Sequence, residues 1–563
     1  MSDPKNSLQK TSLEDQLSDT LTEIKSQTEE KNAKRLADQL GLPYINLTTI
    51  PIDTEALFIV PEKEARTGEL AILQNVENIL KVAVVDPARL ATKTALENLT
   101  KRGFHFNLFI ASHRSLIKAF ERYQDFAQEV AELQGQFIIA DAVAATIKAE
   151  IKIIEDIPKK IASTPSNTAT NLLEVIIVSS IQVDASDIHL ETKENAALFR
   201  FRIDGILHDI VSLSSKAYGL IITRLKLISG MTLNLRDIAQ DGRFTIKLEK
   251  KEIEVRVSVL PGPNGENVVM RILHPKNINL NIKDLGFRDD AHAFITKEIE
   301  RPNGMIITTG PTGSGKTTAL YAFLKEVTDP EIKIITLEDP IEYHLAGVTQ
   351  TQVEADRGYT FAAGLRAILR QDPDIILVGE IRDKETAEIA IQSALTGHIV
   401  FSTLHTNDAA GAIPRFIDMG ANPVSLSAAL IDIMAQRLLR RVCSACKEEY
   451  ASSPEELEKI KKALANLPKT VAIPEITSSL KLARGKGCPL CNQTGYKGRV
   501  GIYEIIHVDS ELEKLITKSP SHAEILDILT KKDFVSMYQD GMLKAVQQVT
   551  TIAELESIVG AAS

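Results

Sequence analysis

The segment that most restricts what this chain can fold into is residues 305–320, MIITTGPTGSGKTTAL. It has the spacing Gly-x-x-x-x-Gly-Lys-Thr, with an apolar run before it and helix-forming residues after it. A strand, a glycine-rich turn and a helix in this order direct backbone N–H groups at phosphate oxygens. In such a loop the lysine reaches the outer phosphates and the Thr317 hydroxyl binds Mg²⁺. The residues predicted to hold phosphate are Gly310, Pro311, Thr312, Gly313, Ser314, Gly315, Lys316, Thr317 and Thr318.

Two further apolar runs end in acidic residues. In residues 332–343 (IKIITLEDPIEY) the run is followed by Glu338, and in residues 372–383 (DPDIILVGEIRD) it is followed by Glu380. Ligands of a parallel sheet lie beyond the carboxyl ends of its strands, so both glutamates are expected beside the phosphate loop. Asp374 precedes its strand and is interpreted as a turn residue.

A third apolar run, residues 396–408 (TGHIVFSTLHTND), is flanked by His398 and His405. Histidine side chains often have structural roles, but either one is a candidate for sensing a terminal phosphate by hydrogen bonding. His405 is the candidate that follows the end of the strand.

The four cysteines form two pairs, Cys443-x-x-Cys446 and Cys488-x-x-Cys491. Four thiolates suit tetrahedral Zn²⁺, and a closed set leaves no position for a reactive water, so a structural zinc site is predicted. The segment between the pairs is longer than in a simple zinc ribbon. It is predicted to contain a helix, with Ser453 as N-cap, Pro454 in the first turn and Glu456 completing a capping box.

Composition limits the alternatives. The 563 residues carry a net charge of -10, which argues against a protein that coats nucleic acid. Between the cysteine pairs Tyr450 is the one aromatic residue, so a zinc ribbon that stacks on bases is not expected. Residues 1–30 lack a signal-peptide pattern and no long uncharged apolar run occurs, so a cytoplasmic location is predicted.

The pattern of apolar runs and turns predicts an α/β protein with several domains. We expect a mobile polar N-terminus (1–30), an N-terminal α/β domain (31–125), a helical or flexible linker (126–165), a small α/β domain (166–285) and a large domain (286–563) that contains the metal loop 443–491.

The four segments GPTGSGKT, ITLEDPIEY, LRQDPDIILVGEIRDKETA and ALTGHIVFSTLHTNDA follow one another in this order. Together they resemble the secretion ATPase superfamily, the hexameric motors of type IV pilus assembly and type II secretion. The resemblance implies a RecA-like P-loop ATPase domain, a smaller preceding α/β domain, and an ATP site between the two.

The same resemblance implies roles for particular residues. Glu338 is expected to act as the base and Glu380 to bind Mg²⁺, although the sequence leaves this assignment open. Arg256 and Arg271 fall where the family places arginines that reach phosphate, and Arg243 is a further candidate. Arginines so placed neutralise charge in the transition state.

Residues 40–47 (LGLPYINL), 60–66 (VPEKEAR) and 80–87 (LKVAVVDP) resemble the N-terminal domain with which such motors dock on membrane-associated partners. Residues 8–40 lack the Arg-Leu-Gly repeat that binds cyclic di-GMP in some members, so this ligand is not expected. The second cysteine pair and TGYKGRVGIYE (494–504) resemble the assembly motors.

The resulting hypothesis is a homo-hexameric ATPase at the inner face of the cytoplasmic membrane, which drives pilin polymerisation through an inner-membrane platform protein and needs no direct contact with nucleic acid. Type II protein secretion and DNA uptake are alternatives that the ATPase segments do not separate. A nucleotide-gated binding module without turnover is disfavoured because both acids and the arginines are present.

Overall fold

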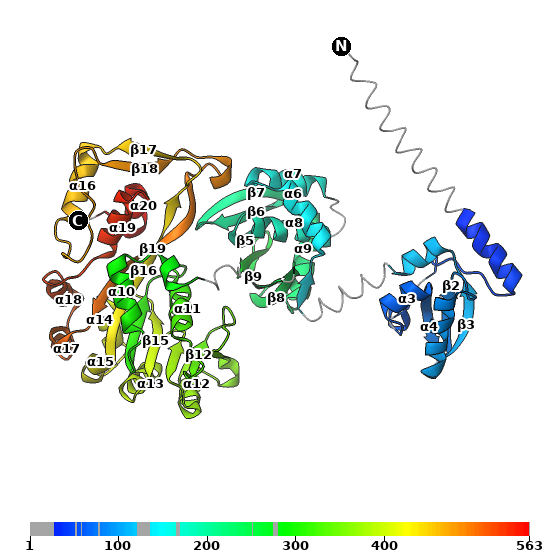
Figure 1. The fold of residues 1–563 in the computed structure, drawn as a ribbon, viewed down its shortest axis with the longest axis horizontal. Coiled ribbons are helices and arrows are strands. Elements are labelled where there is room, and N and C mark those ends of the chain that lie inside the picture. The colour runs from blue at the N-terminus through cyan, green and yellow to red at the C-terminus, as the bar shows by residue number, and fades with distance from the viewer. Residues whose placement is uncertain are drawn as a thin grey trace, which may run out of the picture. The chain divides into compact units, whose positions relative to one another are not determined.

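The computed structural model describes residues 28–50, 53–57, 59–76, 79–120, 135–164, 169–249, 251–273 and 280–561. The predicted mobile segment 1–30 therefore lies almost wholly outside the described residues, and residues 28–40 are helical. The chain divides into two compact units after Ile138 (Figure 1). None of the described helices is long and apolar enough to cross a bilayer.

The first unit is an α/β domain built on a three-stranded sheet of order β1-β2-β3. β1 and β2 are antiparallel, whereas β2 and β3 are parallel. Its strands are β1 (Leu70–Val76), β2 (Ile79–Val84) and β3 (His105–Ile110), and its helices include α2 (Thr54–Leu57), α3 (Glu62–Gly68) and α4 (Leu90–Lys101). Residues 113–120 are also helical. Leu70, Ile72 and Val82 are fully buried between the sheet and these helices.

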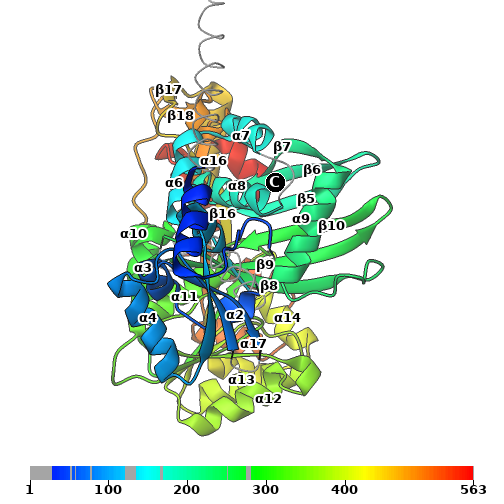
Figure 2. The ribbon, with the colours of Figure 1, turned by 90° about the vertical axis from the view of Figure 1, so that its right-hand side faces the viewer.

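The smaller domain is built on a seven-stranded sheet of order β4-β8-β9-β10-β5-β6-β7, whose first strand ends at the division and whose other strands belong to the second unit. From β8 to β7 each neighbouring pair is antiparallel. Helices α8 and α9 pack on the sheet (Figure 2). The strands are β4 (Gln136–Ile138), β5 (Ala185–Thr192), β6 (Ala196–Ile203), β7 (Ile206–Ser214), β8 (Gln240–Leu248), β9 (Lys251–Gly262) and β10 (Gly265–Ile272), and the helices are α6 (Asp141–Glu150), α7 (Ile157–Ser163), α8 (Ala169–Gln182) and α9 (Ser215–Ile228).

The segment that the sequence suggested as a linker, 126–165, differs from that expectation over its described part. It contains β4, α6 and α7, and the Ile139 N–H donates to the Lys247 carbonyl of β8 at 3.1 Å. Ile147, Ile157 and Ile161 are buried. Residues 139–164 thus belong to the smaller domain rather than to a connector.

The large domain has a seven-stranded sheet of order β13-β12-β14-β15-β11-β16-β19, parallel except for β19. Alternate residues of β11 enter two different cores: Met305 and Ile307 pack in one, and Ile306 packs in the other. Helices therefore cover both faces, as in other parallel sheets. The strands are β11 (Gly304–Thr309), β12 (Ile334–Glu338), β13 (Thr349–Gln352), β14 (Ile375–Val378), β15 (Ile399–Leu404), β16 (Leu430–Val442) and β19 (Tyr496–His507).

The helices of this domain are α10 (Asp289–Glu298), α11 (Lys316–Val327), α12 (Phe361–Ile368), α13 (Lys384–Leu395), α14 (Ala412–Asp418), α15 (Pro423–Ala429), α16 (Pro454–Leu464), α17 (Ser510–Ile516), α18 (His522–Leu529), α19 (Met537–Val546) and α20 (Ile552–Val559). The metal loop adds the hairpin β17 (Lys447–Ala451) and β18 (Lys481–Gly485).

The helix predicted between the cysteine pairs is confirmed as α16. The Ser453 hydroxyl accepts from the Glu456 N–H, and the Glu456 carboxylate accepts from the Ser453 N–H at 2.8 Å. Ile460 and Leu464 are buried in the same core as the central sheet.

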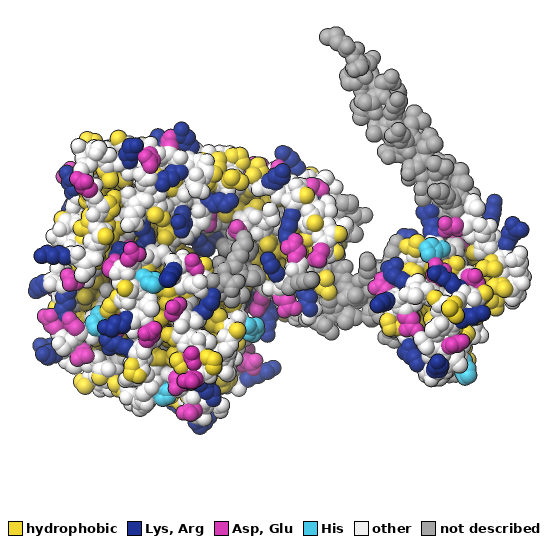
Figure 3. All heavy atoms as spheres, viewed as in Figure 1, with side chains coloured by type: hydrophobic (Ala, Val, Ile, Leu, Met, Phe, Trp, Pro, Cys, Tyr) yellow, Lys and Arg dark blue, Asp and Glu magenta, His cyan; other side chains and the backbone are white. Residues whose placement is uncertain are grey.

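On the face of the larger unit shown in Figure 3, basic and acidic side chains are interspersed.

Candidate nucleotide site and metal centre

The phosphate loop begins where the fully buried strand β11 ends. Gly310, Gly313 and Gly315 have φ values of 148°, 81° and 91°, which side-chain-bearing residues rarely adopt. A Cβ on Gly310 would also lie 2.7 Å from the Gln436 carbonyl oxygen. The loop therefore requires glycine at these points in order to curl around an anion at the N-terminus of α11.

Two polar side chains of the loop form no hydrogen bond to a described residue outside the loop. The Lys316 ammonium donates to the loop's own carbonyls, Gly310 at 2.7 Å and Pro311 at 3.2 Å. Burial lowers the pKa of Lys316, and the carboxylates of Glu380 and Glu342 oppose this shift. The Ser314 hydroxyl is buried and has no hydrogen-bond partner among the described residues. Both groups are available to a phosphate.

Glu380 and His405 lie together at the ends of neighbouring strands. Glu380 follows β14 and His405 follows β15, and the His405 Nε2 atom is 3.3 Å from the Glu380 carboxylate. Arg382 forms an ion pair with the same carboxylate. Glu380 is only 8% exposed and acts electrostatically on Lys316. The structure thus brings together Glu380, His405 and Lys316, which the sequence had placed at one site.

Glu338 ends β12 and is held from three sides. Its carboxylate accepts hydrogen bonds from Tyr321, from Thr336 at 2.6 Å and from Gln350 at 3.2 Å. It is 3% exposed. Burial and the nearby Glu338 carboxylate raise the pKa of Tyr321. Glu338 therefore has the geometry of a group that fixes α11 against the strand ends.

Glu342, four residues further on, is a site residue that the sequence reasoning missed. Burial raises its pKa, and the charges of Arg256, Arg271 and Lys316 oppose this shift. The phosphate-loop lysine and two arginines of the smaller domain therefore act electrostatically on this one carboxylate. The several acidic residues in LEDPIEY could have pointed to Glu342. This segment is irregular, however, and without a regular period the sequence does not show which of its acidic residues faces the site.

Three arginines of the smaller domain form a row across adjacent strands. Arg243 of β8 is opposite Arg256 of β9, which is opposite Arg271 of β10. Like charges directly opposite on a sheet destabilise it, so an anion between them would be favourable. All three line a cavity of about 530 Å³, and Pro340 and Gln352 of the large domain line it too.

Contacts in this row connect the two domains. Arg256 donates to the Ile341 carbonyl at 2.9 Å, beside Glu342. Arg271 is held at 3.0 Å by Asp187, which is itself 5% exposed. The arginine row therefore faces the loop that follows β12.

Arg437 on β16 is a second residue that sequence reasoning missed. Its guanidinium donates to the Asn407 carbonyl at 2.7 Å and to the Gln436 carbonyl at 3.1 Å. Burial lowers its pKa, and its charge contributes to the lowered pKa of Lys316. Arg437 thus links the segment after His405 to the phosphate loop.

Two other predicted positions lie away from this site. Asp374 precedes β14 and accepts from the Lys333 N–H at 2.7 Å, as a turn residue does. His398 precedes β15, and its Nδ1 atom is 2.9 Å from the Ser393 carbonyl oxygen at the end of α13. The candidacy of His398 as a phosphate sensor is therefore wrong, because it lies at the opposite end of the strand.

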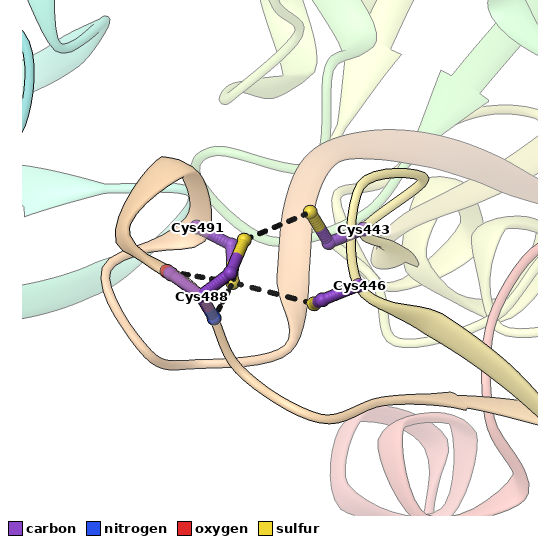
Figure 4. A group of neighbouring side chains, drawn as sticks. All are labelled: Cys443, Cys446, Cys488 and Cys491. Carbon is purple, nitrogen blue, oxygen red and sulfur yellow. Dashed lines mark hydrogen bonds between the residues drawn. The ribbon is translucent and has the colours of Figure 1, made fainter.

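The four cysteines converge at one point (Figure 4). The sulfur atoms are 4.0 Å apart for Cys443 and Cys488, 3.8 Å for Cys446 and Cys491, and 3.6 Å for Cys488 and Cys491. Bonds of about 2.3 Å to a tetrahedral ion place sulfurs about 3.8 Å apart. The Gly495 N–H lies 3.3 Å from the Cys491 sulfur, a contact that stabilises a thiolate. The donor set fits a tetrahedral metal ion.

Fold and site together define a RecA-like P-loop nucleotide-binding protein. The family of type II/IV secretion system proteins matches residues 163–557, and the MshEN domain matches residues 40–130. The chain therefore belongs to the family of type II/IV secretion system proteins, the ATPases of secretion and pilus machines.

Relatives extend over most of the chain. The type IV pilus assembly ATPase PilB of Myxococcus xanthus is 38% identical over 94% of this chain and 91% of its own length. PilB of Thermus thermophilus is 37% identical over 96% of this chain, which spans 58% of that protein. Type II secretion system protein E of Pseudomonas aeruginosa is 40% identical over 79% of this chain and 85% of its own length.

A solved structure shares the fold. The ATPase DotB of Legionella pneumophila superposes with a TM-score of 0.52 at 20% identity, over 71% of this chain and 99% of DotB. This likeness concerns the fold alone.

Proposed function

We propose that the chain is a motor that hydrolyses ATP to drive type IV pilus assembly, through an inner-membrane platform protein. The observation that carries the proposal is that the phosphate-loop region of the large domain and the arginine row of the smaller domain face each other. The phosphate loop, with Glu380 and His405, lies in one domain, and the arginine row of the other domain lies opposite Glu342. Hydrolysis that changes the charge between these surfaces can move one domain against the other.

The proposed roles follow from the contacts. Gly310–Thr318 bind the phosphates, and Mg²⁺ would be held by the Thr317 hydroxyl and Glu380, hard oxygen donors of the type it prefers. When bound, Mg²⁺ neutralises charge on the phosphates. Glu342 shares with Glu338 the candidacy for positioning the attacking water, because the charges of Lys316, Arg256 and Arg271 act on its carboxylate.

A cavity of about 470 Å³ adjoins the phosphate loop at Gly315 and Thr318. Leu285, Leu438 and Tyr503 give it an apolar wall. Its volume and lining suit a purine base and ribose. We assign it to the nucleoside of ATP.

The four cysteines are proposed to bind structural Zn²⁺, on which the local fold depends. Replacing Cys446 by Ser is expected to lower the zinc content from about one to about zero per chain and to unfold the loop 443–491, because structural zinc supplies folding free energy. Atomic emission and protease sensitivity of this loop measure both effects. Ser452→Ala, outside the centre, serves as control, and full zinc retention by the Cys446 variant would contradict the assignment.

The remaining assignments concern assembly. We propose a homo-hexamer that associates peripherally with the inner face of the cytoplasmic membrane. The N-terminal unit, which matches the MshEN domain, would dock on a membrane-associated partner. Direct binding of nucleic acid is not part of the proposal.

Type II secretion is the second candidate, because the type II secretion proteins E are as similar in sequence as the pilus ATPases. The extent of the alignments favours the pilus by a small margin: the two PilB relatives align over 96% and 94% of this chain, and three type II secretion proteins E align over 79%, 88% and 90%.

The function is tested by a clean deletion in the source organism, complemented by the intact gene. Surface filaments are scored by electron microscopy and released proteins by gel electrophoresis. Loss of filaments is the expected result. Intact filaments with missing secreted proteins would identify a type II secretion motor, and excess filaments would overturn the assembly role.

A further inference from the structure

A second group of metal-ligating side chains lies in the large domain, apart from the cysteines. Glu298 ends α10, Asp432 lies near the start of β16 and His507 ends β19. One ligand atom of each lies within 4.8 Å of the others. Asp432 is opposite His507 and also beside Ile306, near the start of β11. The phosphate loop follows the other end of β11, so this group is separate from the nucleotide site.

The carboxylate of Asp432 is fully buried, and one of its two oxygen atoms accepts no hydrogen bond from the described residues. Its Oδ1 atom is 2.9 Å from the His507 Nδ1 atom. Its Oδ2 atom is buried and has no hydrogen-bond partner among the described residues. A buried carboxylate oxygen without a partner is costly, and a cation would remove that cost.

The charges of the group balance only if the His507 imidazole is protonated or a cation is bound. Glu298, which is 3% exposed, and Asp432 supply two negative charges, and Arg301 pairs with Glu298 at 2.5 Å. With a neutral imidazole one positive charge is lacking. The His507 side chain is 40% exposed and its ring meets Phe294 edge-on, so an ion can enter beside it.

We propose that Glu298, Asp432 and His507 bind one divalent transition-metal ion. One imidazole nitrogen and two carboxylate oxygens suit Mn²⁺, Fe²⁺ and Zn²⁺, whereas the absence of a thiolate from the set disfavours soft ions. The 2.9 Å separation of Nδ1 and Oδ1 suits neighbouring ligands of one ion. The ion would tie α10 to β16 and β19, and so hold the first helix of the ATPase domain on its central sheet.

The test is a Mn²⁺ titration of the full-length chain without nucleotide, in which electron paramagnetic resonance reports free Mn²⁺. Mn²⁺ prefers oxygen and nitrogen to sulfur, so the four cysteines do not compete. Without phosphates the Mg²⁺ position lacks most of its ligands. The wild-type chain is expected to bind about one Mn²⁺ with micromolar affinity, and Asp432→Asn and His507→Gln to weaken binding about tenfold or more. Glu388→Gln, an exposed glutamate on α13, is expected to bind as wild type.

A thermal melt gives an independent readout, because a ligand that binds only the folded chain raises the midpoint. Mn²⁺ should raise the midpoint of the wild type and leave that of His507→Gln unchanged. If Asp432→Asn does not fold, the half-exposed His507 variant decides alone. Two results would contradict the proposal: all Mn²⁺ stays free when the wild type is titrated up to millimolar concentration, or His507→Gln binds Mn²⁺ as tightly as the wild type. Either result would show that a protonated imidazole, and not a metal ion, balances the charge.

Discussion

Replacing Glu380 by Gln is expected to lower the kcat for ATP hydrolysis by about 10²–10⁴-fold and to leave nucleotide binding nearly intact. The change keeps the shape of the side chain and removes its charge beside His405 and Lys316. The loop that binds the phosphates is untouched, so it still holds the nucleotide, although Glu380 no longer helps to hold Mg²⁺. Phosphate release under saturating MgATP and binding of a fluorescent ATP analogue measure the two quantities separately.

Glu388→Gln is the matched control, because Glu388 is a half-exposed glutamate of α13 with only a 3.6 Å ion pair to Lys384. It should keep wild-type turnover. Glu342→Gln and Glu338→Gln then separate the two candidates for the base: the base variant loses kcat, whereas a variant that only loosens α11 loses stability first. Wild-type turnover by Glu380→Gln would refute the proposed site.

Replacing Arg256 by Gln is expected to lower kcat by about 10³-fold or more, since arginines that stabilise a transferring phosphoryl group contribute about 10³–10⁵. Arg256 lies at the centre of the row and contacts the segment before Glu342. Steady-state kinetics over a range of MgATP concentrations give kcat and KM separately. A role in the transition state lowers kcat more than it raises KM.

Arg202→Gln, on strand β6 of the same sheet, is the control. Its guanidinium donates to the Gly205 carbonyl at 3.0 Å and lies 3.6 Å from Asp187, so it does not line the cavity shared with the large domain. Arg256→Lys tests geometry, because lysine keeps the charge without the planar fork. Unchanged kcat in Arg256→Gln would mean that Arg256 only holds the domains together.

Much of the site was predictable because strand ends and loops obey local rules. The glycine spacing predicts the phosphate loop, and the rule that ligands lie beyond the carboxyl ends of parallel strands predicts that Glu380 and His405 meet. The capping box of α16 is local too, and the structure reproduces it residue by residue. The phosphate loop and the capping box depend on neighbours within a few positions, whereas the meeting of Glu380 and His405 follows from a general rule for parallel sheets.

The features that the sequence did not predict depend on distant partners. β4 pairs with β8, about a hundred residues further along, and so the apparent linker is part of a sheet. Glu342 is distinguished from Glu338 by Arg256 and Arg271, which come from another domain. Asp432 did leave a local trace, a lone charge within the apolar run LIDIM, but only the fold shows that Glu298 and His507 surround it.

The helix inside the metal loop has a consequence for how this chain can vary. Ile460 and Leu464 of α16 and Leu482 of β18 share one continuous hydrophobic core with Ile376 and Val400 of the central sheet. An excised loop would therefore leave a hole in the interior of the motor domain, and not merely a shortened surface. For protein engineers this means that the loop cannot be exchanged by itself. A chimera must exchange the loop together with the helices against which it packs.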